Sequence, residues 1–374
     1  MNDGRAGNDD EYMRLAVTLA ERGRGFTSPN PVVGAVIVKN GRIIGTGWHK
    51  RYGDFHAERN ALSSCAEDPS GSVMYVTLEP CCHYGKQPPC VDAIIAAKIA
   101  RVVVGSNDPN PLVSGGGIKR LRDAGITVDT GVLKDECDKL NAVFFHYITT
   151  RTPFIAVKYA MTLDGKTACA SGESKWITGE RAREYARKLR SEYSAVAAGV
   201  QTVLADDPLL TCRIKDAHEP LRVIFDSRLR TPLDSKIVST ARAAPVAIAT
   251  CSDDQSRAKL YENAGCRIIK TRSEGGRTSF SEVTEILARE NIDSLFVEGG
   301  GTLCWSAIES GLVRKVYAFI GNIITGGSSP FTPVAGEGFS SLRSALRLRL
   351  QDIITLDDDL LLTATVNLGK SASS

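Results

Sequence analysis

Three residues of the types that bind zinc lie in the first quarter of the chain: His56, Cys81 and Cys90. A neutral imidazole and two thiolates are ligands that suit Zn²⁺. Three protein ligands leave a fourth tetrahedral position open for water, which distinguishes a catalytic zinc site from a structural one. These residues therefore predict a catalytic zinc centre.

Glu58 stands two residues after the histidine of this set. In the H-x-E…P-C…C pattern of zinc deaminases, a glutamate at this position acts as general acid and base without binding the metal. His-x-Glu alone is common by chance and is more often a surface pair on a helix. The downstream Pro80-Cys81 pair and Cys90 make the whole set specific, so we predict that Glu58 is catalytic.

The two thiolates are spaced more widely than in the Cys-x-x-Cys form of that pattern. Eight residues, rich in glycine and proline, separate Cys81 from Cys90. Cys82 adjoins a predicted ligand, and adjacent side chains rarely reach the same ion, so we expect it beside the site. In a cytosolic chain the other cysteines are better interpreted as small packed residues than as disulfides: Cys65, Cys137, Cys169, Cys212, Cys251, Cys266 and Cys304.

The composition limits the class of protein and its partners. A chain of 374 residues suggests two domains, which we place at residues 1–150 and 151–374. Its 43% hydrophobic and 24% charged residues are typical of a soluble globular protein. The net charge of +3 is small and dispersed, which argues against a nucleic-acid surface. A polar N-terminus and the lack of an apolar run of about 18 residues predict a cytoplasmic protein without a membrane span.

The elements that must position the zinc residues form an α/β pattern in the first half. We predict helices and strands in these places: helices at 10–22, from 56, at 91–98, 118–124 and 134–149; strands at 32–38, 42–45, 73–78, 101–105 and 126–129. Asn40-Gly41 predicts a hairpin between the first two strands. The zinc residues come from two helix starts and one strand end, which meet at the carboxyl edge of the sheet in an open α/β fold. We therefore expect a three-layer α/β/α domain.

Three polar loop residues are expected at the same edge: Asn30, Asp108 and Asn110. Their turn chemistry explains them as well as a role in binding a heterocyclic substrate does, so both interpretations stay open. His49 has no thiolate or carboxylate at ligand spacing, and we expect an ordinary surface or packing histidine.

The second half has its own α/β pattern. After a break at residues 151–153, strands are predicted at 154–160, 195–199, 222–225, 246–249, 267–269, 294–297 and 316–320, with a helix at 180–191. A last pair of strands, around 352–355 and 360–365, suggests an antiparallel edge on a mainly parallel sheet. This arrangement is similar to the dihydrofolate reductase fold. Residues 253–277 carry only a weak pattern.

Two features of this half could do chemistry. Lys158 lies within an apolar strand, where a lysine must be paired or poised for reaction. Glu298 is followed by Gly299-Gly300-Gly301-Thr302 between a strand and a helix, where backbone N–H groups can approach an anion. The motif is not the G-x-G-x-x-G fingerprint, and a tight turn explains it equally well when it is taken alone.

The zinc segment resembles a known family. His56-Ala57-Glu58 together with Pro80-Cys81-x-His83-x-Gly85-Lys86-x-Pro88-Pro89-Cys90 looks like the deaminase half of the bifunctional riboflavin-biosynthesis deaminase/reductases, within the cytidine-deaminase fold. The resemblance implies that His83 and Lys86 hold the ribose phosphate of the substrate. Gln87 departs from the threonine that the family leads us to expect.

The second half resembles the NADPH-dependent reductase of the same family. The resemblance implies that the dinucleotide is lined by Ala160, Trp176, Thr202, Asp206, Ser227, Gly300, Gly301 and Thr302. It also implies that the phosphoribosyl substrate is held by Ser174, Arg190, Leu210, Arg213 and Glu298, and arginine suits phosphate because its donors form a fixed fork. Lys158 could then donate a proton as hydride arrives.

The resemblance implies one Zn²⁺ and NADPH as cofactors, a small phosphoribosyl-pyrimidine as substrate, and a homo-oligomer, either a dimer or a tetramer. Two alternatives are a zinc deaminase acting on another nucleobase or on nucleic acid with an accessory nucleotide-binding domain, and a ligand-binding protein without catalysis. A deaminase acting on nucleic acid would be expected to have a basic face and the Cys-x-x-Cys spacing. The second is disfavoured by the presence of Glu58 and a complete ligand set.

Overall fold

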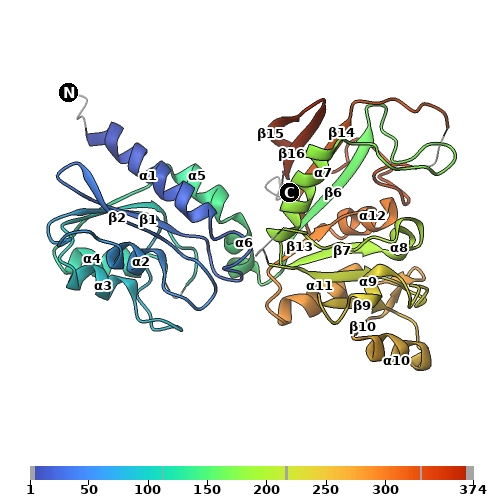
Figure 1. Ribbon diagram of the computed structural model, residues 1–374, viewed down its shortest axis with the longest axis horizontal. Coiled ribbons are helices and arrows are strands. Elements are labelled where there is room, and N and C mark those ends of the chain that lie inside the picture. The colour runs from blue at the N-terminus through green and yellow to red at the C-terminus, as the bar shows by residue number, and fades with distance from the viewer. Residues whose placement is uncertain (1–4, 112, 215–217, 329–330, 368–374) are drawn as a thin grey trace. The chain divides into compact units, whose positions relative to one another are not determined.

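The computed structural model describes residues 5–111, 113–214, 218–328 and 331–367. The chain divides into two compact units, Met1–Arg151 and Thr152–Ser374 (Figure 1). Each unit has its own sheet and its own core, and each is described by itself. Among the described residues, no helix is both long enough and apolar enough to span a bilayer.

The first unit is built on a five-stranded sheet in the order β2-β1-β3-β4-β5. The strands are β1 (Gly34–Lys39), β2 (Arg42–Trp48), β3 (Val73–Leu78), β4 (Arg101–Ser106) and β5 (Thr127–Thr130). β1 runs antiparallel to β2 and β3, whereas β3, β4 and β5 run parallel. Asn40 and Gly41 have φ angles of 51° and 74°, as a type I′ turn requires, so the predicted hairpin is confirmed.

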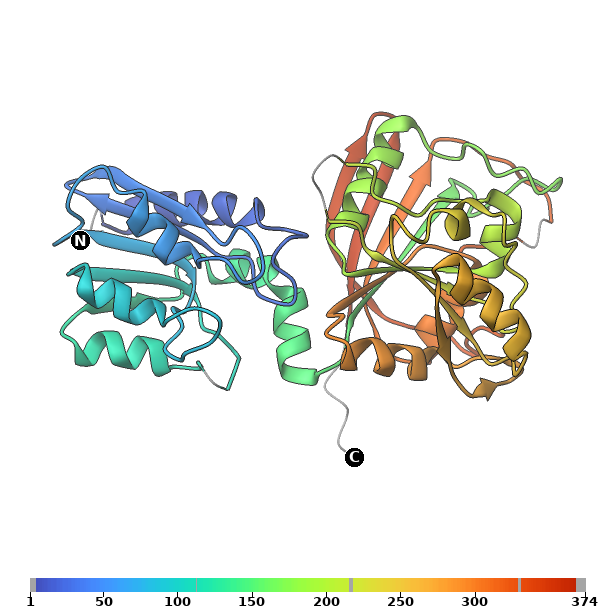
Figure 2. The same ribbon diagram turned by 60° about the horizontal axis from the view of Figure 1, so that its bottom comes forward.

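Helices cover both faces of this sheet. They are α1 (Arg5–Glu21), α2 (Ala57–Ser63), α3 (Cys90–Ala96), α4 (Gly116–Asp123), α5 (Lys134–Leu140) and α6 (Ala142–Thr150). Apolar residues of α1 and α5 form one core with one face of the strands, and those of α2, α3 and α4 form another core with the opposite face. Figure 2 shows α1 on one side of the sheet and α3 and α4 on the other. The predicted three-layer arrangement is confirmed.

The prediction of one closing helix at 134–149 was wrong, because the chain forms two helices there, α5 and α6, separated at Asn141. The Asn141 backbone (φ −109°, ψ 21°) is not helical. Its buried side chain binds the main chain of Val32, accepting from the amide at 2.9 Å and donating to the carbonyl at 2.9 Å. A tertiary contact thus interrupts a helix that local spacing predicts to be continuous.

The second unit is built on a nine-stranded sheet in the order β10-β9-β8-β7-β13-β6-β14-β16-β15. Its strands are β6 (Phe154–Thr162), β7 (Ala195–Gly199), β8 (Leu221–Phe225), β9 (Val246–Thr250), β10 (Arg267–Lys270), β13 (Ser294–Val297), β14 (Val313–Gly321), β15 (Leu348–Leu356) and β16 (Asp359–Val366). The first seven strands in this order, from β10 at the edge through β14, run parallel to one another. β16 is antiparallel to both of its neighbours, β14 and β15. The predicted antiparallel edge is confirmed.

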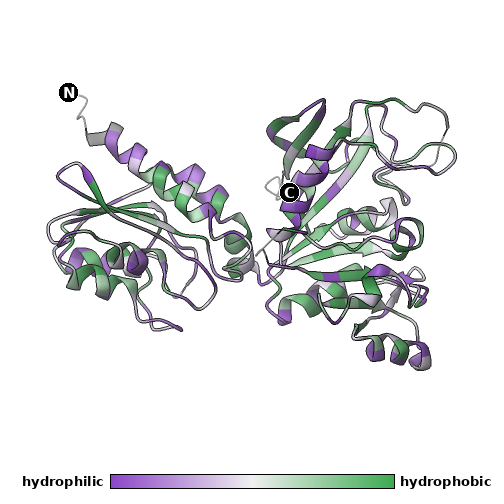
Figure 3. Ribbon diagram, in the orientation of Figure 1, coloured by the Kyte–Doolittle hydropathy of each residue, from purple (hydrophilic) through white to green (hydrophobic). Residues whose placement is uncertain are grey.

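The helices of the second unit are α7 (Glu180–Ser191), α8 (Val200–Asp206), α9 (Lys236–Ser239), α10 (Gln255–Ala264), α11 (Phe280–Arg289) and α12 (Gly301–Glu309). Apolar residues of α11 and α12 pack on one face of the central strands. These strands are among the most apolar parts of the unit, whereas α7 and α10 carry many polar residues (Figure 3). The weakly patterned segment 253–277 contains α10, β10 and the short pair β11 (Ser273–Glu274) and β12 (Arg277–Thr278).

Candidate active sites

The three predicted zinc ligands converge in the first unit. The Nδ1 atom of His56 lies 3.5 Å from the Sγ atom of Cys81 and 3.4 Å from that of Cys90. Each residue comes from a different element: His56 is the N-cap of α2, Cys81 follows β3, and Cys90 is the first residue of α3. The ligand atoms all lie within 4.8 Å of one another, so three short elements bring their ends to one point.

These distances fit a zinc ion. Zinc bonds of about 2.1 Å to nitrogen and 2.3 Å to sulfur, at a tetrahedral angle, separate a nitrogen from a sulfur ligand by about 3.6 Å. The backbone N–H of Cys90 donates to the Cys81 sulfur at 3.4 Å, and hydrogen bonds from Cys90 and His56 lower the pKa of Cys81 to about 4. The thiolate form of Cys81, which binds zinc, is therefore favoured. Cys82 packs against the core of the unit instead.

Glu58 lies next to these ligands without being one of them. It belongs to the first turn of α2 and is only 3% exposed. Burial, and then the neighbouring Cys81 thiolate, raise the pKa of Glu58 to about 6. A carboxyl group with a pKa near neutrality can both accept and return a proton, as a general acid and base must.

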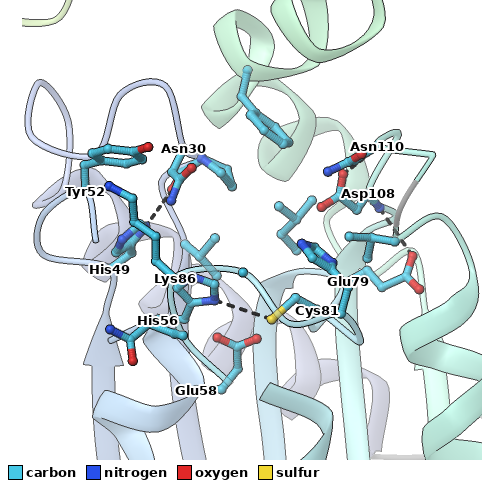
Figure 4. A pocket seen from close by; sticks show the side chains of 18 of the residues that line it. Asn30, His49, Tyr52, His56, Glu58, Glu79, Cys81, Lys86, Asp108 and Asn110 are labelled. Carbon is cyan, nitrogen blue, oxygen red and sulfur yellow. Dashed lines mark hydrogen bonds between the residues drawn. The ribbon is translucent and has the colours of Figure 1, made fainter. Parts of the chain in front are cut away.

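A pocket of about 200 Å³ opens above the ligands. It is lined by residues from five separate segments, and all the predicted first-unit contacts except the more deeply placed Cys90 lie on its wall: Asn30, His56, Glu58, Cys81, His83, Lys86, Asp108 and Asn110. Figure 4 shows Glu58 at the bottom, beside His56 and Cys81, with Asn30 and Asp108 on opposite walls. The metal ligands and the polar loop residues thus share one cavity.

The insert between the two cysteines folds back over this pocket. The ammonium group of Lys86 lies 3.9 Å from the centre of the Tyr52 ring, and Gln87 donates to the carbonyl of Gly53 at 2.9 Å. The segment that carries Lys86 and His83 is therefore fixed against residues 52–53 as a wall of the pocket.

His49 is buried, as a packing histidine would be, but it also has a place at the site that the sequence did not indicate. It lines the pocket and has its ring centre 5.2 Å from that of His56. One ring nitrogen, Nδ1, lies 3.2 Å from the carbonyl of Pro31, whereas none of the described residues forms a hydrogen bond with Nε2. Burial and the nearby His56 lower the pKa of His49, so the neutral form prevails. Only the tertiary structure reveals this placement, because His49 lacks ligand spacing in the sequence.

In the second unit, Lys158, Glu298 and Arg190 form a buried charged cluster. Lys158 is in β6 and Glu298 directly follows β13, and these strands are paired through Val157 and Val297. Arg190, from α7, binds Glu298 with two nitrogens, Nη2 at 3.0 Å and Nε more closely, and Lys158 Nζ lies 3.8 Å from the same carboxylate. Lys158 is therefore paired, and burial lowers its pKa.

The glycine-rich turn after Glu298 has the open backbone that the sequence predicts. Gly299 and Gly300 have φ angles of 120° and 63°, which side-chain-bearing residues rarely adopt. The start of α12, at Gly301 and Thr302, follows directly. Thr202 in the first turn of α8 faces this turn, since its Oγ1 would lie 3.5 Å from a Cβ atom placed on Gly300. The helices α8 and α12 thus begin just after two adjacent strands, β7 and β13. The main-chain N–H groups at helix starts suit the phosphates of a dinucleotide.

The other predicted contacts lie on segments around this sheet edge. Ala160 is in β6, Ser174 and Trp176 are in the loop before α7, and Asp206 ends α8. Trp176 is 66% exposed with the Arg183 guanidinium 4.5 Å from its ring centre, and Asp206 lies 3.6 Å from Lys175. Ser227 follows β8 and accepts a hydrogen bond from the amide of Thr278 at 2.9 Å. Leu210 is buried and Arg213 is exposed, and both have φ angles of 54° in one loop.

Comparison with known proteins finds a match for each of the two units. Residues 6–106 match the cytidine and deoxycytidylate deaminase zinc-binding region, and residues 153–362 match the RibD C-terminal domain. The chain is 47% identical to the riboflavin biosynthesis protein RibD of Actinobacillus pleuropneumoniae, over 98% of this chain and 97% of that protein. It belongs to the RibD family.

Other RibD relatives support this assignment. The RibD protein of Bacillus amyloliquefaciens is 41% identical over 97% of both chains. Among solved structures, a diaminohydroxyphosphoribosylaminopyrimidine deaminase/5-amino-6-(5-phosphoribosylamino)uracil reductase from Thermotoga maritima is 36% identical, with a TM-score of 0.86 over 97% of this chain and 99% of that one. RibD of Acinetobacter baumannii is 37% identical, with a TM-score of 0.85 over 96% and 99%. The predicted pairing of a zinc deaminase with an NADPH-dependent reductase is confirmed.

Proposed function

We propose that this enzyme deaminates 2,5-diamino-6-ribosylamino-4(3H)-pyrimidinone 5′-phosphate in its first unit and reduces the ribosyl side chain of the product to ribityl in its second. The observation that carries the proposal is the convergence of His56, Cys81 and Cys90 above Glu58 in a pocket whose wall also holds the cation of Lys86. That combination suits an amino-heterocycle joined to a phosphate.

In the deamination, His56, Cys81 and Cys90 hold the metal, which supplies a water molecule of lowered pKa when bound. Glu58 accepts a proton from the attacking water and delivers a proton to the departing amino group. The ring carbon gains an oxygen and loses ammonia, so Glu58 returns to its starting state. Burial suits Glu58 to both roles, because it raises the pKa of the carboxyl group to about 6.

The remainder of the pocket binds and orients the substrate. Lys86 and His83 hold the phosphate, and the Tyr52 ring positions the Lys86 ammonium group by a cation–π contact. Asn30, Asp108 and Asn110 meet the polar edges of the pyrimidine. Burial, and then the nearby Glu79 carboxylate, raise the pKa of Asp108 to about 6, so that near this pH Asp108 can donate as well as accept a hydrogen bond.

In the reduction, NADPH supplies a hydride to the ribosyl carbon that becomes part of the ribityl chain. Gly300, Gly301 and Thr302 hold the dinucleotide with main-chain donors, and its other contacts are Ala160, Trp176, Thr202, Asp206 and Ser227. Ser174, Arg190, Leu210, Arg213 and Glu298 hold the phosphoribosyl substrate. Lys158 donates the proton that balances the hydride, from an ammonium group fixed by Glu298.

The protein is proposed to act in the cytoplasm as a homo-oligomer, either a dimer or a tetramer. The edge strand β15 leaves large apolar side chains in solvent: Leu348 is 45%, Leu350 is 53% and Ile353 is 61% exposed. An open edge of this kind favours pairing with another chain. Light scattering coupled to gel filtration tests this, and a monomer at micromolar concentration would contradict it.

One experiment tests the proposed reactions together. The zinc-loaded protein is incubated with the diaminopyrimidinone phosphate and ammonia is measured; NADPH is then added and its absorbance is followed. We expect one ammonia per substrate and then one NADPH oxidised. Ammonia release only from a substrate without the phosphate, or from a nucleic acid, would overturn the proposed substrate.

A further inference from the structure

Glu79 is a buried carboxylate that neither binds the metal nor points at Glu58. It is 3% exposed and stands two residues before Cys81, at the end of β3. Its backbone N–H donates to the carbonyl of Ser106, at the end of the neighbouring strand β4.

The side chain of Glu79 accepts four hydrogen bonds, all from main-chain amides. One oxygen accepts from Gly117 at 3.0 Å and Ile118 at 3.2 Å. The other accepts from Gly115 at 3.1 Å and Asp108 at 3.4 Å. A buried carboxylate needs donors of this kind, because burying an unpaired charge is costly.

Three of these donors lie at the start of α4, whose N-cap residue, Gly115, has no side chain that could cap it. Glu79 thus does from a distance of 38 residues what an N-cap side chain does locally, since it binds the amides of the second and third helical residues. The contact is also sterically close. A Cβ atom on Gly117 would lie 2.0 Å from the carbonyl oxygen of Pro80.

The fourth donor, Asp108, lies at the other end of the connection between β4 and α4. One carboxylate therefore binds both Asp108, just after β4, and the start of α4. The loop carries Asp108 and Asn110 on the pocket wall, and the Asp108 side chain in turn accepts from the amide of Asn110 at 2.8 Å. Figure 4 shows Glu79 beside Asp108 on the wall opposite Asn30.

We propose that Glu79 is a positioning residue for the deaminase, which fixes Asp108 and Asn110 relative to the metal ligand Cys81. The inference rests on the proposed function, in which Asp108 and Asn110 contact the substrate. Because Cys81 lies two residues away on the same strand end, one rigid segment sets the distance between the reacting carbon and the groups that hold the ring.

The test uses Glu79→Gln in the full-length, zinc-loaded enzyme. Glutamine replaces one accepting oxygen with an amide group that donates, so one pair of main-chain amides loses its acceptor. We expect kcat/KM for ammonia release to fall at least tenfold, mainly through KM, while zinc stays at one per chain and reductase turnover is unchanged. Glu79→Asp, which keeps the charge but is shorter, should lose less. Glu67→Gln, an exposed change of the same chemistry, should match wild type.

A double-mutant cycle separates positioning from general structural support. On an Asn110→Ala background, Glu79→Gln should cost less than it does in the wild-type chain, because one of the two residues through which it acts is already gone. Losses that multiply in full, or zinc lost in parallel with activity, would overturn the proposal. If Asn110→Ala is fully active while Glu79→Gln is impaired, the positioning role falls and the deaminase assignment stands. A wild-type chain that releases no ammonia from the substrate overturns both.

Discussion

The two active sites balance their charges in different ways. In the first unit, His56, Cys81 and Cys90 converge on one point beside Glu58, and a bound zinc ion would balance the charge of the two thiolates. In the second unit, Glu298 is shared by Arg190 and Lys158, so the protein supplies both signs. The deaminase should therefore depend on a bound ion for its organisation, whereas the cluster at the reductase site is organised by the chain itself.

The largest expected effect comes from removing a zinc ligand. Cys90→Ser should abolish both stoichiometric zinc binding and ammonia release, because serine is a poor zinc ligand and the described part of the chain brings only three ligands together here. The reductase should keep its wild-type turnover with the deaminated substrate. Zinc content and both activities are measured on the same preparation.

Cys82→Ser is the matched control for this comparison. It makes the same substitution at the cysteine next to the ligand Cys81. The Cys82 side chain packs against the core of the unit and does not belong to the group of three ligands. We expect one zinc per chain and nearly full deaminase activity. Loss of zinc from Cys82→Ser would show that the ligand set is wrong, and loss of reductase activity from Cys90→Ser would show that the two sites are not independent.

Glu58→Gln should have the next largest effect, while leaving the metal in place. General acid and base groups contribute about 10²- to 10⁴-fold to rate, so kcat for ammonia release should fall within that range. Glutamine is nearly isosteric with the 3%-exposed glutamate, and zinc content and thermal stability should hold. Deaminase activity retained at more than a tenth of wild type would remove Glu58 from the reaction.

The two sites also differ in how far the sequence could predict them. The zinc ligands and Glu58 follow from a local pattern of residue types, and the strands that deliver them follow from apolar runs. The ion pairs of Glu298 join residues 108 and 140 positions away, and no spacing rule links such positions. His49, Glu79 and the break at Asn141 were missed for the same reason, since each is defined by a tertiary contact.

The proton-donor role proposed for Lys158 would give the reductase an alkaline pH dependence that the deaminase should lack. Burial lowers the pKa of Lys158; the charge of Glu298 raises it and that of Arg190 lowers it. If the ammonium form donates the proton, reductase kcat/KM should fall tenfold per pH unit as pH rises above this pKa, which lies below the usual 10.5 for lysine. The profile is measured on the deaminated substrate at saturating NADPH.

Two variants should move this alkaline limb in opposite directions. Arg190→Gln removes a positive charge and should shift it to higher pH, whereas Glu298→Gln removes the negative partner and should shift it to lower pH. Lys158→Met should remove the limb and lower turnover about 100-fold. Normal turnover in Lys158→Met, or a limb that stays in place in both charge variants, would exclude Lys158 as the donor.

The smallest expected effect is in the insert that closes the deaminase pocket, where Gln87 replaces the threonine expected from the family resemblance. Gln87 makes one neutral hydrogen bond, 2.9 Å long, to the carbonyl of Gly53. Such a bond contributes about 0.5–1.5 kcal/mol net, which corresponds to a two- to tenfold change. Gln87→Ala should therefore raise the deaminase KM several-fold and leave kcat and the zinc content unchanged. Threonine is too short to span the same gap, so Gln87→Thr should behave like Gln87→Ala.

Tyr84→Ala, at a 78%-exposed position of the same insert, is the control and should leave KM unchanged. A KM unchanged in both Gln87 variants would mean that the contacts of Lys86 with Tyr52 hold the insert without Gln87.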